Sequence, residues 1–171
     1  VMISVTTLES SHARSKEPRA SRPSNRLATM RILNDAGVPA SVLVAIIPGI
    51  NDSELEAILE ASAEAGARRA GYIMRRLPFE IKGLFQNWLE VHFPVRTNRV
   101  FSLIRQCREG NLNTAKFGSR MRGTGPYSEM LNKRYKLACQ RLGLNQGNEE
   151  GDFDCSQFQP PLQAGNQMQL I

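Results

Sequence analysis

Residues 40–52 read ASVLVAIIPGIND, and this stretch decides the fold. Ala40 to Ile47 is an unbroken apolar run rich in β-branched residues, which is typical of a parallel strand buried on both faces. Pro48 to Asn51 then breaks the run as a turn. Either Asp52 or Ser53 is suited to cap a following helix, whose apolar positions are Leu55, Ile58, Leu59 and Ala63.

Strand and helix patterns alternate on both sides of this stretch. Residues 2–7 alternate as in a strand, with Ile3 and Val5 toward the helices and Ser4 and Thr6 on the other face. Residues 23–36 form a helix pattern that begins on a proline and stops at a glycine, and residues 70–74 form a third strand. This order predicts an α/β fold built from three parallel βα units. Three strands alone leave open edges, so we expect further chain, a partner or a rearrangement to complete the core.

The pattern changes after residue 78, which divides the chain into three segments. Residues 1–78 hold the βα units. Residues 79–144 carry helical stripes around a Gly- and Arg-rich loop at 112–125, followed by a helix pattern over 127–142. Residues 145–171 are rich in Gln, Asn, Gly and Pro, which predicts a disordered tail.

Charge is distributed unevenly along this chain of 171 residues and net charge +6. Residues 96–141 hold eleven basic and two acidic residues, a net charge of +9, whereas residues 145–171 hold four acids and no base. Such a basic block favours an anionic partner, with nucleic acid as the first candidate, and the alternative is a solvated helical face. The chain begins on an apolar run without Met, which indicates a fragment.

Several classes of protein are disfavoured because the sequence lacks the features that define them. No apolar run approaches the roughly 20 residues of a membrane span, and no leader is visible, so we expect a cytoplasmic protein. The three cysteines, Cys107, Cys139 and Cys155, lack the spacing of metal ligands and fit structural thiols in a reducing compartment. His12 and His92 have no paired acid or second ligand at metal spacing, and we predict neither a catalytic residue nor a metal ligand in this chain.

Seven stretches, in this order, resemble one known family. They are ISVTT (3–7), EPR (17–19), PSNRL…AGVP (23–39), IIPGIND (46–52), AGARRAGY (65–72), RLP (76–78) and FGSRMRGTGPY (117–127). Together they resemble the second half of radical S-adenosylmethionine (SAM) proteins of the DNA-repair-photolyase-like group, relatives of spore photoproduct lyase. The resemblance covers essentially the whole chain.

The resemblance implies the C-terminal part of a partial (β/α)6 TIM-like barrel, whose fourth to sixth strands are the three predicted here. It also implies a lyase-like enzyme that cleaves SAM reductively at a 4Fe–4S cluster and performs radical chemistry on an unknown substrate, with damaged nucleic acid as a candidate. The family's CxxxCxxC cluster loop belongs to an N-terminal half that this sequence does not contain. We therefore expect this chain alone to be inactive and to need that half as its partner.

Ligands of parallel barrels lie at the carboxyl ends of the strands, which selects candidate cofactor contacts here. Hydroxyls of Ser4 and Thr6 would face the lumen and bind the SAM carboxylate or ribose, the alternative being bonds to backbone or water. By resemblance the turn after the second strand passes the adenine, although its residues are also ordinary turn and cap chemistry. The candidate contacts in this turn are Pro48, Gly49, Asn51 and Asp52.

Basic residues supply the candidate substrate contacts. By resemblance Arg19 lies at the barrel mouth and Arg76 follows the last strand, and a guanidinium suits a carboxylate or phosphate; the alternative is a surface ion pair such as Arg19 with Glu17. Two departures from the family are Arg75, where Leu is common, and Phe79, where His is common. In the Gly-rich loop, phosphates would be held by Lys116, Arg120 and Arg122, with Phe117 and Tyr127 available for stacking on bases.

The final residues, Gln167 to Ile171, resemble the QLxLF peptide by which bacterial DNA enzymes bind the sliding clamp, with simple disorder as the alternative. Two other interpretations of the chain stay open. One is a non-catalytic basic module that binds nucleic acid and associates with the clamp. The other is an inert product of a broken or partly assembled gene.

Overall fold

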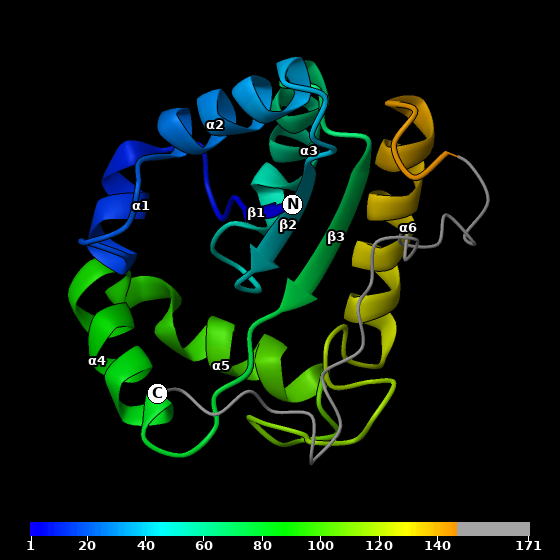
Figure 1. Cartoon of the computed structure of the whole chain (residues 1–171). Coiled ribbons are helices and arrows are strands. Elements are labelled where there is room, and N and C mark those ends of the chain that lie inside the picture. Colours follow the sequence, from blue (N-terminus) through cyan, green and yellow to red (C-terminus); the bar gives the residue numbers. More distant parts are fainter. Residues whose placement is uncertain (147–171) are drawn as a thin grey trace, which may run out of the picture.

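The computed structural model describes residues 1–146, which form a mixed α/β fold with a three-stranded parallel sheet and six α-helices (Figure 1). The strands are β1 (Met2–Ser4), β2 (Ser41–Ile46) and β3 (Arg69–Met74), in the spatial order β1-β2-β3. Ile3 lies opposite Val42 in the register, and Ile46 lies opposite Met74. The three predicted strands and their parallel direction are thus confirmed, although β1 is shorter than predicted.

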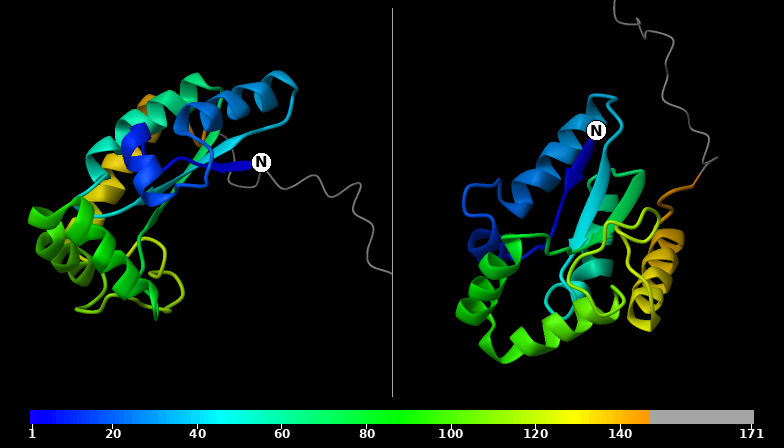
Figure 2. Two further views of the ribbon diagram at one scale, coloured as in Figure 1. Left: turned by 90° about the vertical axis from the view of Figure 1, so that its left-hand side faces the viewer. Right: turned by 90° about the horizontal axis from the view of Figure 1, so that it is seen from below.

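One face of the sheet carries the main core. The side chains of Val42, Val44 and Ile46 are fully buried and pack against the apolar face of α3 (Leu55–Glu64). Helix α2 (Pro23–Asp35) covers β1 on the same side, and α6 (Pro126–Arg141) packs against α3. The left view of Figure 2 shows these helices together on one side of the strands. Burial of aliphatic side chains on this face is the main contribution to stability.

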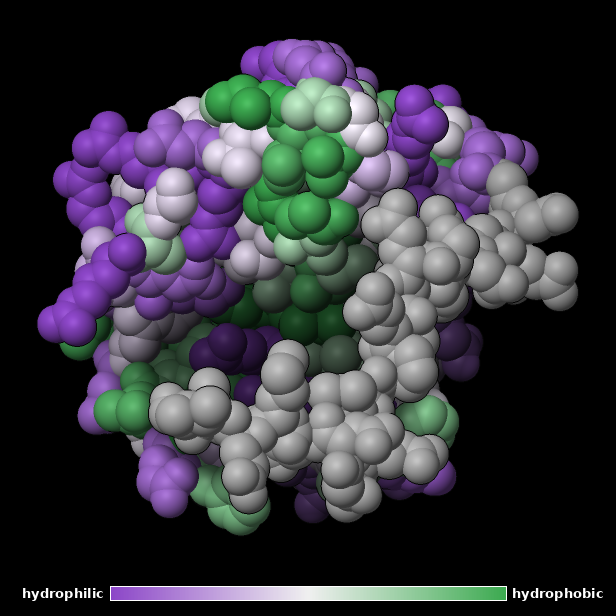
Figure 3. Space-filling model, in the orientation of Figure 1, coloured by the Kyte–Doolittle hydropathy of each residue, from purple (hydrophilic) through white to green (hydrophobic). Residues whose placement is uncertain are grey.

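The opposite face of the sheet is not covered by any helix of residues 1–146 to a comparable extent. Its residues alternate with the buried ones, and Leu43, Ala45, Gly71 and Ile73 are only half-buried. The prediction that the second strand is buried on both faces was therefore wrong for one face. Figure 3 shows a hollow over this face, with an apolar floor that continues to the upper rim as a band of hydrophobic side chains, and with hydrophilic side chains on its left.

A second apolar cluster closes the carboxyl edge of the sheet. Helices α4 (Ile81–His92) and α5 (Thr97–Gln106), joined by a short turn at Pro94–Arg96, lie beyond the ends of β2 and β3 (Figure 1). Helix α1 (Ser10–Lys16) meets α4 through a hydrogen bond of 3.2 Å from Trp88 Nε1 to the Ser15 carbonyl. The buried members of this cluster are Ile47, Ile50, Leu77, Phe85, Leu89, Val100, Phe101 and Ile104.

The Gly- and Arg-rich loop is fastened to the end of β3 by a buried arginine. Arg108 is only 1% exposed, and its guanidinium donates to the carbonyls of Met74, Arg75 and Arg120 at 2.8–3.1 Å. The Met74 amide also donates to the carbonyl of Met121 at 2.7 Å. Since three carbonyls meet this charge, the side chain holds the loop and the strand end together.

Two boundaries differ from the sequence prediction. A 3-10 turn at Asp52–Glu54 precedes α3, and neither Asp52 nor Ser53 caps that helix, because the Asp52 side chain is bonded elsewhere. Asn145, placed in the predicted tail, accepts a hydrogen bond from the Ala70 amide at 2.9 Å. Residues 147–171 are not described, so the predicted tail, Cys155 and the clamp-like peptide Gln167 to Ile171 lie outside the described residues.

Within residues 1–146, none of the helices is both long and apolar enough to traverse a lipid bilayer.

Candidate functional site

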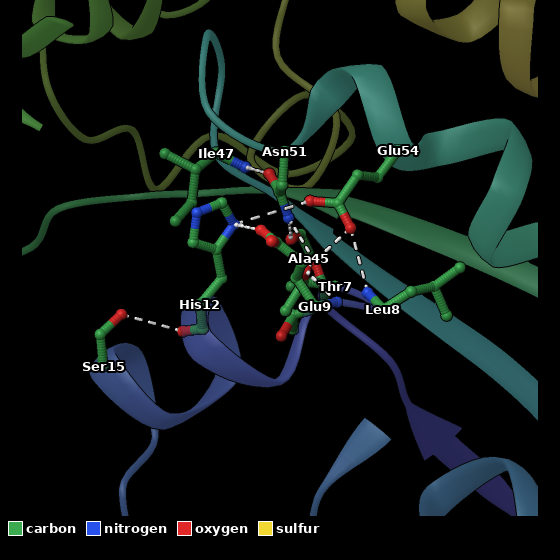
Figure 4. A network of polar contacts seen from close by, with 10 residues as sticks. Thr7, Leu8, Glu9, His12, Ser15, Ala45, Ile47, Asn51 and Glu54 are labelled. Carbon is green, nitrogen blue, oxygen red and sulfur yellow. Dashed lines mark hydrogen bonds and ion pairs between the residues drawn. The ribbon is translucent and has the colours of Figure 1, made fainter. Parts of the chain in front are cut away.

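The carboxyl edge of the sheet is organised by one buried amide, that of Asn51 (Figure 4). Its Nδ2 donates to the carbonyls of Thr6 and Ala45, and its Oδ1 accepts from the Ile47 amide at 2.6 Å. The ends of β1 and β2 are thereby joined through a single side chain. An amide suits this position because it supplies donors and an acceptor together.

A carboxylate completes the network on the β1 side. Glu54 Oε2 accepts hydrogen bonds from the Thr7 hydroxyl at 2.8 Å and from the Leu8 amide at 3.0 Å. His12 Nδ1 lies 3.1 Å from Glu9 Oε2 and 4.0 Å from Glu54 Oε1 (Figure 4). Glu54 therefore fixes the segment between β1 and α1 against the start of α3.

The six predicted cofactor contacts do not converge on one open cavity. The Ser4 hydroxyl accepts from Arg26 at 2.9 Å, Thr6 is 8% exposed at the edge of the sheet, and Pro48 is buried. Gly49 needs its positive φ of 78°, and a Cβ there would lie 3.1 Å from the Leu103 side chain. The turn is thus covered by α5, and the side-chain amide of Asn51 is already hydrogen-bonded to backbone groups.

Asp52 points toward the helical layer. Its carboxylate accepts from the Tyr127 hydroxyl, and its carbonyl accepts from Arg134 at 2.9 Å. Burial, followed by the hydrogen bond to Asp52, raises the pKa of Tyr127. Asp52 therefore ties the start of α3 to α6 and does not face the hollow.

Arg19 and Arg76 occupy separate places. Arg19 is exposed, and Glu17, its partner in the alternative interpretation as a surface ion pair, binds Arg26 at 2.7 Å. Arg76 is half-buried beyond β3. The pKa of the Arg108 guanidinium is lowered mainly by burial and, to a smaller extent, by the charge of Arg76. Arg19 and Arg76 therefore do not form one binding site in the structure of residues 1–146.

The three basic residues of the Gly-rich loop diverge. Lys116 Nζ lies 3.9 Å from Glu109, and Arg120 lies over the Phe117 ring at 5.5 Å. Only Arg122 reaches a larger concavity, where it lies over the rings of Tyr72 and Tyr135. This basic groove, of about 490 Å³, lies between β3 and α6 and is lined by Arg69, Ala70, Arg122, Tyr135, Lys136, Cys139, Gln140, Leu144, Asn145 and Gln146.

The structure also brings together two cations that the sequence did not select as a site. Lys16 ends α1 and Arg75 follows β3, and both line a pocket at the carboxyl edge of the open face. In the sequence, Arg75 stands out only as a departure from the family pattern. Helical spacing and alternation give no signal for such a pair, because its members are far apart in the sequence.

Neither cysteine of the described residues resembles a cluster ligand. Cys107 and Cys139 are buried as free thiols, and burial raises the pKa of each. Among residues 1–146 there is no group of three or more His, Cys, Asp or Glu side chains that could hold a metal ion. The described residues therefore do not fit an iron–sulfur cluster, and the predicted SAM contacts do not by themselves form a SAM site.

No protein-family model, curated protein or solved structure that was compared with the chain matches it. The fold and the edge of the sheet are therefore the observations on which a function has to rest.

Proposed function

We propose that this chain is the C-terminal wall of a (β/α)6 barrel of the radical SAM type, completed by a half that carries the CxxxCxxC loop. The observation that carries the proposal is the difference between the two faces of the parallel sheet. Helices pack on one face, whereas the other face exposes Leu43, Ala45 and Ile73 in part. Parallel βα units with helices on one face only are the arrangement of a barrel wall.

The edges of the sheet support the same proposal. β1 is a parallel edge strand whose outer side pairs with no other strand of residues 1–146. Arg26 donates to the Ser4 carbonyl at 2.7 Å and so satisfies one of its free backbone groups. An open edge next to an open face is costly in an isolated domain, and pairing with a further βα unit would remove both costs at once.

In this proposal the chain supplies lumen wall and ligand contacts, and the missing half supplies the iron–sulfur cluster. The part of the chain is to shape the hollow, to fix the carboxyl ends of β1 and β2 through Asn51, and to exclude water from that edge.

The test is co-expression with the cluster-carrying half of a spore-photoproduct-lyase-like protein. We expect the two chains to copurify in equal amounts, and 5′-deoxyadenosine to form from SAM under reducing conditions only when both are present. Leu43→Arg on the open face should prevent copurification, whereas Leu137→Arg, at an exposed position of α6, should not. Cluster absorbance and SAM cleavage by this chain alone, after reconstitution with iron and sulfide, would contradict the proposal.

A second candidate function, nucleic-acid binding, is favoured by the basic groove between β3 and α6. Among residues 1–146 its lining includes Arg69, Arg122 and Lys136 and no acidic residue, and Tyr135 adds an aromatic surface. Retardation of labelled single-stranded DNA, measured at several salt concentrations, tests this function. Arg69→Glu with Lys136→Glu should abolish binding and Arg99→Glu, on α5, should weaken it far less; equal loss from both changes would indicate only non-specific charge.

A further inference from the structure

A pocket of about 250 Å³ lies where the open face of the sheet meets α1 and α4. It is lined by Lys16, Arg75, Ile81, Leu84, Phe85 and Trp88. Arg75 continues the alternation of β3 on the open face, two residues after Ile73. The hydrogen bond from Trp88 to the Ser15 carbonyl holds α4 against the residue next to Lys16. Two cations and two aromatic rings are therefore fixed around one small space.

The two cations of this pocket have no anionic partner among the described residues. The Nε of Arg75 is buried without a hydrogen-bond partner, and its guanidinium lies 5.7 Å from the centre of the Phe85 ring. The acid that acts on both cations is Glu17, and its carboxylate is already paired with Arg26 at 2.7 Å. Glu54, whose charge also acts on Lys16, accepts hydrogen bonds from Thr7 and Leu8.

This arrangement costs free energy unless an anion joins it. Burial, and then the charge of Arg75, lower the pKa of Lys16 from the usual 10.5 to about 8. A carboxylate or phosphate between the two side chains would pair with both and supply the acceptor that Arg75 Nε lacks. The guanidinium and the ammonium are thus placed for an anion, and the other charges that act on Lys16 are those of Glu17, Arg26 and Glu54.

The rest of the lining indicates what the anion is attached to. Phe85 is stacked near Trp88, with ring centres 5.7 Å apart, and Leu84 and Ile81 are exposed at 70% and 39%. Such a surface favours a flat apolar group over a hydrated ion. We propose that this pocket binds a small organic anion, in which a carboxylate or phosphate is joined to a planar apolar body.

The single tryptophan of the chain gives a direct readout, because Trp88 lines the pocket. Its indole N–H signal in a ¹H–¹⁵N NMR spectrum is followed while phenyl phosphate, benzoate, inorganic phosphate or benzyl alcohol is added. We expect a saturable shift with phenyl phosphate and benzoate, binding of inorganic phosphate weaker by about tenfold, and no saturation with benzyl alcohol. Whichever of phenyl phosphate and benzoate binds more tightly identifies the preferred anionic group.

Variants assign the effect to the two cations. Lys16→Met and Arg75→Met remove the charge and keep most of the apolar stem of the side chain, and each should weaken binding of phenyl phosphate by about tenfold or more. Lys82→Met removes an exposed charge from α4 and should leave binding unchanged. No saturable shift with either aromatic anion, or equal binding by wild type and Arg75→Met, would overturn the inference. Because the test uses this chain alone, it can succeed even where the barrel proposal fails.

Discussion

The two faces of the β-sheet use the same strands for different purposes. On one face Val42, Val44 and Ile46 are fully buried under helices, and on the other Leu43 and Ala45 remain half-buried beside a hollow. The two cations without an anionic partner in the described part of the chain, Lys16 and Arg75, also lie at the edge of the open face. The covered face thus accounts for folding, whereas the open face holds surface that folding of residues 1–146 does not use.

The largest expected effect compares the two faces within β2. Ile46→Ala should lower the free energy of unfolding by about 2–5 kcal/mol, because it leaves a cavity in the main core. Leu43→Ala on the open face should lower it by less than about 1.5 kcal/mol, since its side chain is only half-buried. Urea denaturation of both variants measures the difference. Equal losses would show that the open face is as well packed as the covered one.

Much of the covered face could be predicted from the sequence. The alternation of Ile3 and Val5 with Ser4 correctly assigned β1 to the two faces, and the apolar run of β2 correctly marked a central strand. The half-open second face was missed because a continuous apolar run reports the composition of a strand and not the presence of a covering helix. Coverage depends on where α4 and α5 pack, which residues 40–52 do not encode.

The next effect concerns the edge that joins the two faces. Asn51→Ala would leave the Ile47 amide and the carbonyls of Thr6 and Ala45 without their hydrogen-bond partner. It should lower the free energy of unfolding by about 3 kcal/mol or more. Asn25→Ala, at an exposed site of α2, should change stability by less than about 0.5 kcal/mol. Thermal and urea unfolding of both variants test this. A mild effect of Asn51→Ala would return its amide to the candidates for ligand binding.

The candidate site was harder to predict than the fold. The sequence placed Asn51 and Asp52 correctly at a strand end, yet strand-end position does not reveal that the Asn51 amide is used by backbone groups. The sequence gives no sign of the pair Lys16 and Arg75, because the two residues meet only through the packing of α1 beside the end of β3. Pairing of Arg26 with Glu17, in place of Arg19, likewise depends on the position of α2 relative to β1.

A smaller effect should distinguish the open face by its response to pH. The pKa of Lys16 is about 8 in the folded state and 10.5 in the unfolded chain. Below pH 8 Lys16 is charged in both states, so the full cost of burying its charge lowers the free energy of unfolding. Between these values the unfolded chain holds the additional proton, so stability rises with pH and the cost is relieved. Lys16→Met should therefore raise the unfolding free energy by about 1 kcal/mol at neutral pH, and by progressively less toward pH 10.5. A gain that is the same at both pH values would argue against burial of this charge.

The smallest effect belongs to the outer layer on the covered side, between α3 and α6. Arg134 donates from Nε and Nη2 to the two carboxylate oxygens of Glu56, at 2.7 Å and 2.6 Å, and this pairing lowers the pKa of Glu56 below 4.5. The two side chains are about one third exposed, so Glu56→Gln should cost only about 0.5 kcal/mol at neutral pH.

The direction of the pH dependence is opposite to that of Lys16. The ionised form of Glu56 is favoured in the folded state, so its contribution is complete above pH 4.5 and is lost as pH falls through the lowered folded pKa. The difference between wild type and Glu56→Gln should therefore shrink in acid, whereas Glu60→Gln, exposed on the same helix, should show little difference at any pH. Urea titrations at neutral pH and in acid measure this. If the Glu56→Gln difference persists unchanged in acid, side-chain packing and not charge joins α3 to α6, and the contrast in pH response between the two sides of the sheet disappears.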